Sequence, residues 1–293
     1  MTIKVRSDAT GGAIQNEGGL EAINVGSGGI VTFPQGAIVP GMQVGQCRLT
    51  RDGSGNLLLA PYEGTYIYIN GVFRAIPSAG VTLSPTGVPA STTLYIYASW
   101  TGSTIALSAD TVAPVKDSNS GVRVKSNNSG FTLVGMARSS SAPAWIDTTS
   151  QRFVLSWFNK RPIQLWNPLV STSVVSGTTS WIASGPTVEF LTWANELVEI
   201  STIGAANVSV GEYAYINTDF DATLIPNDPG SIVQSGSIIT NIPISLTYRG
   251  YLSEGYHSTR MISKNSTNGA SFSVVGSSGP GLARTICNGF VMG

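Results

Sequence analysis

The apolar residues of this chain occur in short runs that alternate with polar residues or end at glycine, asparagine, proline or serine. Residues 93–100 show the alternation best: Leu94 and Ile96 fall on one face of an extended segment, and Tyr95 and Tyr97 fall on the other. A two-residue period is typical of β-strands, and helix signals are nearly absent elsewhere. The sequence therefore predicts an all-β fold.

Two local segments refine this prediction. Asn70-Gly71 lies between two apolar runs, and this pair favours a two-residue hairpin turn because both residues tolerate a positive φ. Residues 190–199 carry apolar residues at a helical spacing, but ten residues make a short helix and strand alternation resumes at residue 198. We expect a single turn before a strand there.

The chain divides into three parts by its pattern. Residues 1–45 form a glycine-rich arm, residues 46–160 a central antiparallel β module, and residues 161–293 a C-terminal β-sandwich that is jelly-roll-like. The expected strands are 13–15, 22–25 and 29–33 in the arm; 56–60, 65–70, 72–76, 93–100, 105–107, 122–124 and 131–136 in the centre; and 188–193, 198–203, 213–217, 238–248, 261–262, 272–275 and 285–291 in the sandwich.

Charge is scarce in this chain. Only 32 of 293 residues are charged, where a soluble domain averages about 25%, so much of the surface is expected to face neighbouring subunits. The net charge is zero and no basic arm stands out, which favours neither nucleic acid nor anionic membrane as a partner. The sequence contains no signal peptide and no apolar run of about 18 residues, so we expect synthesis in a cytoplasm without membrane insertion.

Three sets of segments resemble bacteriophage virion proteins, particularly tail-fibre and related appendage proteins. The resemblance includes Ile-Asn-Gly at 69–71, Leu-Ser-Trp-Phe-Asn at 155–159 and Leu-Ser-Glu-Gly-Tyr-His at 252–257. It also includes segments 47–62, 76–81, 93–98, 121–126, 132–137, 190–194 and 291–293, and so reaches across most of residues 46–293.

The resemblance implies a non-enzymatic virion structural protein, foremost a homotrimeric tail fibre. It would attach to other virion proteins through residues 1–45 and contact a bacterial surface glycan or protein. Glycine-spaced short strands with unprotected edges make a closed homo-oligomer physically plausible. Two alternatives stay open: a head fibre, decoration, collar or adaptor with structural contacts only, and a tailspike-type glycan depolymerase.

Candidate catalytic groups are few. His257 is the only histidine, so any Ser-His-Asp or Cys-His site must use it, yet no nucleophile motif surrounds it. We interpret it as a hydrogen-bonded turn or interface residue. Cys47 and Cys287 lie 240 residues apart, which indicates no disulfide framework, and we interpret both as small core or interface residues.

Asp219, Asp221 and Asp228 form the densest acidic cluster, with Asn217 and Asn227 beside them. Such oxygens could serve as a glycosidase carboxylate pair or bind Ca²⁺, although the spacing is not that of an EF-hand. Because Asp, Asn, Gly and Pro dominate turns, a solvated turn between strands is the preferred interpretation. The sequence thus assigns no catalytic, cofactor-binding or metal-binding residue.

Three further features have weaker functional interpretations. The glycine-rich segment 276–281 lacks the Lys-Ser/Thr pair of a phosphate loop and is interpreted as a turn. The N-x-S/T sequons at Asn127, Asn207 and Asn265 are treated as chance matches. Aromatic side chains that could stack on sugars are Tyr66, Tyr68, Tyr95, Tyr97, Trp181 and Trp193.

Overall fold

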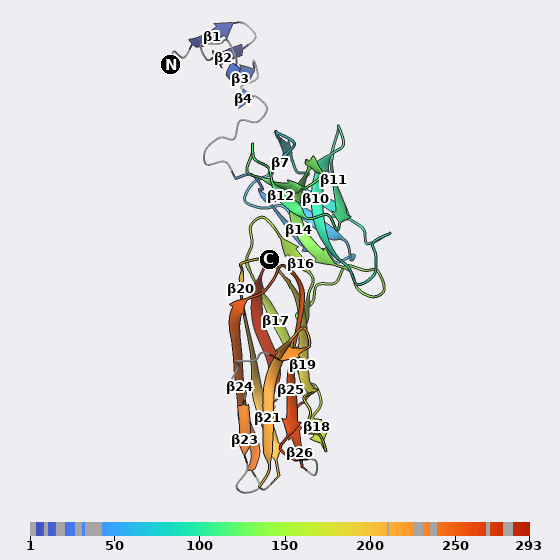
Figure 1. Cartoon of the computed structure of the whole chain (residues 1–293). Helices are drawn as coiled ribbons and strands as arrows, with labels where there is room; N and C mark the ends of the chain where they lie inside the picture. Colours follow the sequence, from blue (N-terminus) through green and yellow to red (C-terminus); the bar gives the residue numbers. More distant parts are fainter. Residues whose placement is uncertain are drawn as a thin grey trace.

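The computed structural model describes the backbone of strands 4–8, 11–15, 21–26 and 31–32, and then residues 43–209, 211–224, 231–234, 239–267, 270–277 and 284–293 (Figure 1). Every regular helix or strand in these residues is a β-strand. The predicted all-β class is confirmed. Within the described residues, no helix is long and apolar enough to cross a membrane.

The arm contains one antiparallel sheet of four short strands in the order β1-β2-β3-β4. These strands are β1 (Lys4–Asp8), β2 (Gly11–Gln15), β3 (Glu21–Gly26) and β4 (Val31–Thr32). Strands β2 and β3 overlap the expected segments 13–15 and 22–25, β4 lies within the expected segment 29–33, and β1 was not predicted. The short strands pair with one another within the chain.

The central module is built on a six-stranded sheet in the order β11-β10-β14-β13-β12, with β16 paired to β14. A three-stranded sheet, β5-β6-β9, and the hairpin β7-β8 accompany it. Their bounds are β5 Cys47–Arg51, β6 Leu57–Pro61, β7 Tyr66–Ile69, β8 Val72–Ala75, β9 Val81–Leu83, β10 Thr93–Trp100, β11 Ile105–Asp110, β12 Pro114–Lys116, β13 Arg123–Lys125, β14 Asn128–Arg138 and β16 Val154–Ser156.

Two local predictions for this module are confirmed. Strand β10 spans the predicted residues 93–100. Asn70 and Gly71 connect β7 to β8, with φ of 47° and 82°, as a two-residue hairpin turn with two positive φ angles requires.

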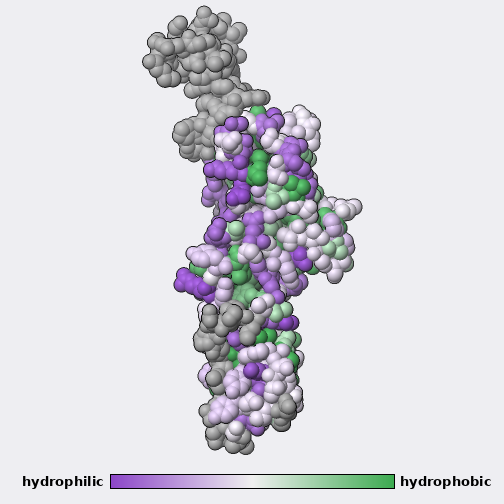
Figure 2. All heavy atoms as spheres, viewed as in Figure 1, coloured by the Kyte–Doolittle hydropathy of each residue, from purple (hydrophilic) through white to green (hydrophobic). Residues whose placement is uncertain are grey.

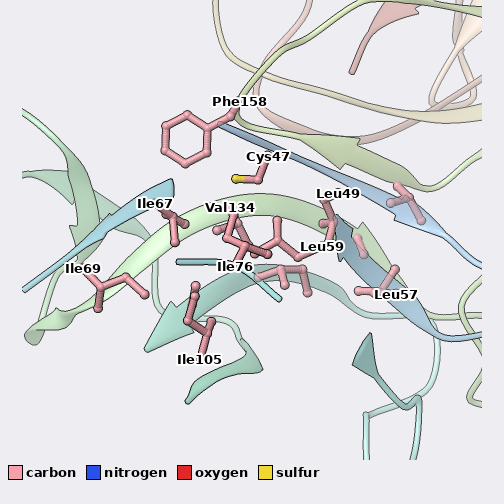
Figure 3. Close-up of a cluster of buried hydrophobic side chains, with 14 of the residues drawn as sticks. Cys47, Leu49, Leu57, Leu59, Ile67, Ile69, Ile76, Ile105, Val134 and Phe158 are labelled. Carbon is pink, nitrogen blue, oxygen red and sulfur yellow. The ribbon is translucent and has the colours of Figure 1, made fainter. Parts of the chain in front are cut away.

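The first face of the six-stranded sheet packs inside the module. Leu94, Ile96 and Val134 from this sheet contact a cluster that includes Leu59 and Ile67 from the smaller strands (Figure 3). Burying these aliphatic side chains contributes about 1.5–3 kcal/mol each. Space is tight at residue 135 of β14, which is a glycine: a Cβ atom there would lie 2.4 Å from the backbone oxygen of Leu155 on the neighbouring strand β16 and 2.4 Å from Cδ2 of Leu49 on β5 of the other sheet.

The C-terminal half consists of two facing sheets. One has the order β15-β19-β25-β21-β22, with β23 paired to β21, and the other β17-β27-β20-β26-β18, with β24 paired to β20. The strands are β15 Gln151–Arg152, β17 Pro162–Pro168, β18 Ser173–Ser176, β19 Ile182–Thr192, β20 Leu197–Val208, β21 Tyr213–Phe220, β22 Thr223–Leu224, β23 Ser231–Gln234, β24 Ile239–Tyr251, β25 Gly255–Asn265, β26 Ser271–Val274 and β27 Ile286–Met292.

Two apolar clusters fill the space between these sheets. The cluster away from the central module joins residues such as Ile216 and Met261 of one sheet to Ala206, Ile244 and Phe272 of the other. Residues 193–196 form the predicted turn between β19 and β20, with Asn195 at φ 62°. This arrangement is the β-sandwich expected from the sequence.

The second face of the six-stranded sheet packs against the sandwich. Tyr97, Leu133, Met136 and Leu155 of the central module belong to one buried cluster with sandwich residues. The sandwich contributes Leu165, Val188, Phe190, Leu191, Trp193, Val198, Ile200, Phe220, Cys287 and Val291. We call this cluster the junction core. The two bodies therefore stack end to end, and the C-terminus lies beside their contact (Figure 1).

The backbone also crosses between the two bodies. Strand β15 pairs in parallel with β19 of the sandwich, and two residues later β16 pairs with β14 of the central sheet. Residues 159 and 160, at the predicted boundary between the central module and the sandwich, contact both bodies. Asn159 donates hydrogen bonds from Nδ2 to the carbonyls of Gly45 and Cys47, and Lys160 lies 2.5 Å from Glu196. The boundary at residue 160 remains a prediction.

We predict that truncating one junction-core residue destabilises the whole chain. Leu155 is fully buried, so Leu155→Ala should lower the free energy of unfolding by about 2–5 kcal/mol. Urea denaturation, followed by tryptophan fluorescence and by protease sensitivity of both halves, measures the loss. Val170→Ala, at a side chain 61% exposed, is the matched control and should change stability by less than about 0.5 kcal/mol. Loss confined to the central half would contradict this prediction.

Candidate functional site

The predicted acidic cluster is divided between a strand and a turn. Asp219 lies in β21 and is 4% exposed, and its Oδ2 accepts a hydrogen bond of 2.9 Å from Nε of Arg260. Asn217 is also buried in β21. The interpretation of this cluster as a solvated turn is therefore wrong for Asp219. Asn227 and Asp228 lie outside the described residues.

Asp221 follows β21 in a turn and contacts His257. Its Oδ2 lies 2.7 Å from Nδ1 of His257, and its Oδ1 accepts the backbone N–H of Ser258. The other ring nitrogen, Nε2, lies 2.8 Å from the carbonyl oxygen of Ser253. His257 is 5% exposed and lies in strand β25, so the expected turn location is wrong and the expected hydrogen bonding is found.

The two bonds of His257 have a chemical consequence. A carboxylate and a carbonyl are both acceptors, so both bonds form together only when both ring nitrogens carry a proton. With both nitrogens occupied, the ring has none left to activate a nucleophile. Asp219 and Asp221 face Arg260 and His257 respectively, and no group of three or more metal-ligating side chains occurs among the described residues. Asp219 and Arg260 form an ion pair between β21 and β25, and Asp221 and His257 are joined by a hydrogen bond.

Both cysteines are buried free thiols, as expected. Cys47 lies in the core of the central module and Cys287 in the junction core. Burial raises the pKa of Cys47 to about 12 and that of Cys287 to about 11. Neither is a thiolate near neutral pH, and a thiolate is the reactive form.

The structure separates the candidate aromatic side chains. Tyr68, Tyr97 and Trp193 are buried, so their interpretation as sugar-stacking groups is wrong. Tyr97 donates to the carbonyl of Val112, and Trp193 packs edge-on against Trp157 with ring centroids 5.0 Å apart. Tyr66 is 42% exposed and stays available.

The two remaining candidates, Tyr95 and Trp181, are half-buried. Tyr95 donates from its hydroxyl to Glu254 across the junction, over 2.6 Å. Desolvation of Tyr95, helped by Glu254, raises the pKa of this phenol. Trp181 lies under the ammonium of Lys264.

The other weak candidates have structural contacts. Asn265 is 2% exposed and donates from Nδ2 to the carbonyl of Val175, which leaves this sequon buried. Asn207 accepts the backbone N–H of Asn241, while Asn127 is exposed. In the glycine-rich segment, Gly276 binds Thr172 through its backbone, and residues 278–281 lie outside the described residues.

The structure reveals a site that the sequence interpretation missed, a cleft of about 460 Å³ beside the junction. Four arginines line it: Arg48 and Arg51 from β5, Arg152 from β15, and Arg161 just before β17. Asp147 is the one acidic side chain among its lining residues. We call this the junction cleft.

Three of these guanidinium groups are fixed by the same kind of contact. The Nε–H group of Arg48 donates a hydrogen bond to the carbonyl of Asn159 (3.0 Å). In the same way, Arg51 donates to the carbonyl of Trp145 (2.7 Å), and Arg152 donates to the carbonyl of Gln164 (2.7 Å). Arg48 also stacks over the ring of Tyr62. Fixing Nε orients the terminal nitrogens, which are the edge that arginine uses to bind oxyanions.

No sequence signal could have found this cleft. Its arginines come from two segments, residues 48–51 and 152–161, that lie about 100 residues apart, and neither segment is a long basic run. The fold therefore gathers four arginines that the sequence shows as no basic arm, in a chain whose net charge is zero.

We predict that the Asp221–His257 pair stabilises the sandwich. Asp221→Asn should lower the free energy of unfolding by about 1 kcal/mol, because it removes a charge-assisted hydrogen bond from a half-exposed carboxylate. Equilibrium urea denaturation measures the change. Glu63→Gln, at an exposed carboxylate of the central module, is the control and should leave stability unchanged. Equal stability of Asp221→Asn and the parent protein would contradict the assignment.

Comparisons with known proteins identify no family. No family model matches the sequence, and no curated protein matches it. Similar solved structures include that of the infectious bursal disease virus Gx strain, with 12% identity and a TM-score of 0.26 over 85% of this chain and 66% of that chain. An exo-β-1,3-galactanase from Phanerochaete chrysosporium has 12% identity and a TM-score of 0.20, covering 98% of this chain and 67% of that chain.

A third similar structure is a tryptic core variant of Bacillus thuringiensis Cry1Da. It has 14% identity and a TM-score of 0.23, and the match covers 84% of this chain and 47% of the toxin chain. This chain therefore spans about two thirds or less of the length of these structures. Likenesses this weak carry no argument about function.

Proposed function

We propose that this chain is a non-enzymatic structural protein of a bacteriophage particle, a trimeric tail fibre or appendage that takes part in recognition of the host surface. The proposal starts from the resemblance of residues 46–293 to such proteins. The structural observation that supports it best is the junction core, in which four central-module residues and ten sandwich residues are buried together.

A shared core suits an appendage for a mechanical reason. A protein that holds a recognition surface away from a particle needs stiff connections between its parts, and a large buried apolar contact removes the hinge that a short linker would leave. At this junction the aromatic pair Trp157–Trp193 and the ion pair Lys160–Glu196 add contacts around the core. The central module and sandwich can then act as one rod.

The surface supports an assembled state. The chain has only 32 charged residues for an accessible surface of 14435 Å², so charged side chains are sparse on this surface. In Figure 2 the strongly hydrophilic residues gather over the central module and the junction, while paler residues cover the far part of the sandwich. Exposed apolar side chains on the sandwich include Val170, Val174 and Tyr251, at 61–69% exposure. Contacts with identical subunits would cover these side chains.

The depolymerase alternative needs two carboxylates facing a common groove, about 5–9.5 Å apart. Among the described residues, Asp219 and Asp221 are instead paired with Arg260 and His257. No observation favours this alternative over the structural role.

We predict that the purified full chain is a trimer that binds host cells. Light scattering should give about 92 kDa, three times the chain mass of 30.6 kDa, and labelled protein should bind intact cells of the host saturably. Labelled protein that has been unfolded serves as the control, because it should not bind cells saturably. A monomer of 30.6 kDa that ignores cells would contradict the fibre proposal.

The role of residues 1–45 needs its own test. A chain without them should fail to enter phage particles if the arm attaches the protein to the virion. Normal incorporation of the truncated chain would overturn this role. Cross-linking of the arm to capsid or portal subunits, in place of tail proteins, would favour the head-fibre or collar alternative.

A further inference from the structure

The junction cleft carries more positive charge than its own contacts neutralise. Its charged lining side chains are four arginines, Arg48, Arg51, Arg152 and Arg161, against one acid, Asp147, and Gly293 also lines the cleft. The arginines are four of the 16 basic residues in a chain whose net charge is zero. Like charges gathered in one cleft repel one another, which costs stability unless a ligand offsets it.

Asp147, the acidic side chain in the cleft, forms an ion pair with only one of the four arginines. Oδ2 of Asp147 lies 3.3 Å from Nη1 of Arg152, and Oδ1 of Asp147 is buried with no hydrogen-bond partner in the described structure. No ion pair is found for Arg48, Arg51 or Arg161 among the described residues. The side chain of Arg161 is exposed, while its backbone pairs with Gly293 through two hydrogen bonds.

The remaining donors are preorganised. The Nε contacts of Arg48, Arg51 and Arg152 hold three guanidinium planes against backbone carbonyls of the surrounding walls. The rotamer entropy of these long side chains is therefore largely lost before any ligand arrives. A ligand that carries several oxyanions can use the terminal nitrogens in the paired geometry that carboxylate, sulfate and phosphate groups favour.

From this arrangement we infer that the junction cleft binds an acidic saccharide, through oxyanion groups of the carboxylate, sulfate or phosphate type. The volume of about 460 Å³ lies within the usual range of small-ligand sites, about 300–1,000 Å³. Nucleic acid fits less well, because it needs an extended basic track, whereas the junction cleft is a local cluster in a chain of zero net charge. The saccharide class rests on the proposed function, whereas oxyanion binding does not.

Titration calorimetry on the full-length protein tests this inference. The probes are a uronate hexasaccharide, a sulfated hexasaccharide, a neutral hexasaccharide, inorganic sulfate and a six-nucleotide single strand. We expect at least one acidic hexasaccharide to bind more tightly than the neutral one, free sulfate and the oligonucleotide. Raising the salt concentration should weaken this binding, because salt screens exposed charges.

Matched variants locate the site. Arg161→Gln should weaken binding of the acidic hexasaccharide by about tenfold or more, and Arg161→Lys should fall between it and the parent, because lysine keeps the charge without the paired donors. Arg249→Gln, at a 67% exposed arginine on β24, should bind as the parent does. Unchanged thermal unfolding of all three variants shows that folding is intact.

Several outcomes would overturn the inference. The first is that neither acidic hexasaccharide binds. The second is that Arg249→Gln weakens binding as much as Arg161→Gln does. The third is that free sulfate binds as tightly as the acidic hexasaccharides. Tighter binding of the oligonucleotide would replace the saccharide with nucleic acid. Because these measurements use no cells, a protein that binds acidic saccharide yet ignores host cells would contradict the proposed function alone.

Discussion

The structure depends on one constraint, the burial of both faces of the six-stranded central sheet. One face carries Leu94 and Ile96 into the core of the central module, and the other carries Tyr97 and Met136 into the junction core. A sheet with two apolar faces must be covered on both sides. Here the end of the sandwich supplies the second cover, so the two bodies form one unit.

The position of the junction cleft follows from the same constraint. The cleft lies beside the contact, and its arginines come from β5, from β15 and from the segment that enters β17. Because the backbone passes from β15 in the sandwich to β16 in the central sheet within four residues, the walls of the cleft are tied to both bodies. A relative shift of these bodies would separate the four guanidinium groups, so the stiffness proposed for an appendage also preserves the proposed binding site.

Local sequence patterns predicted the strands well and the site poorly. The alternation in residues 93–100 and the Asn70-Gly71 pair report on neighbouring residues, and both were confirmed. The same alternation could not say what covers the face of Tyr97, because a tyrosine can line a core or a surface. Burial of Asp219 and the gathering of the arginines arise from contacts between segments far apart in sequence, which a local pattern does not contain.

Native-state amide hydrogen exchange tests the central claim, that a shared core makes the central module and the sandwich one cooperative unit. The slowest amides of β14 in the central sheet and of β19 in the sandwich should exchange through the same opening, with free energies within about 1 kcal/mol of each other and the same dependence on denaturant. Exchange of one strand at a free energy several kcal/mol below the other would show that the two bodies open independently, and would contradict this account.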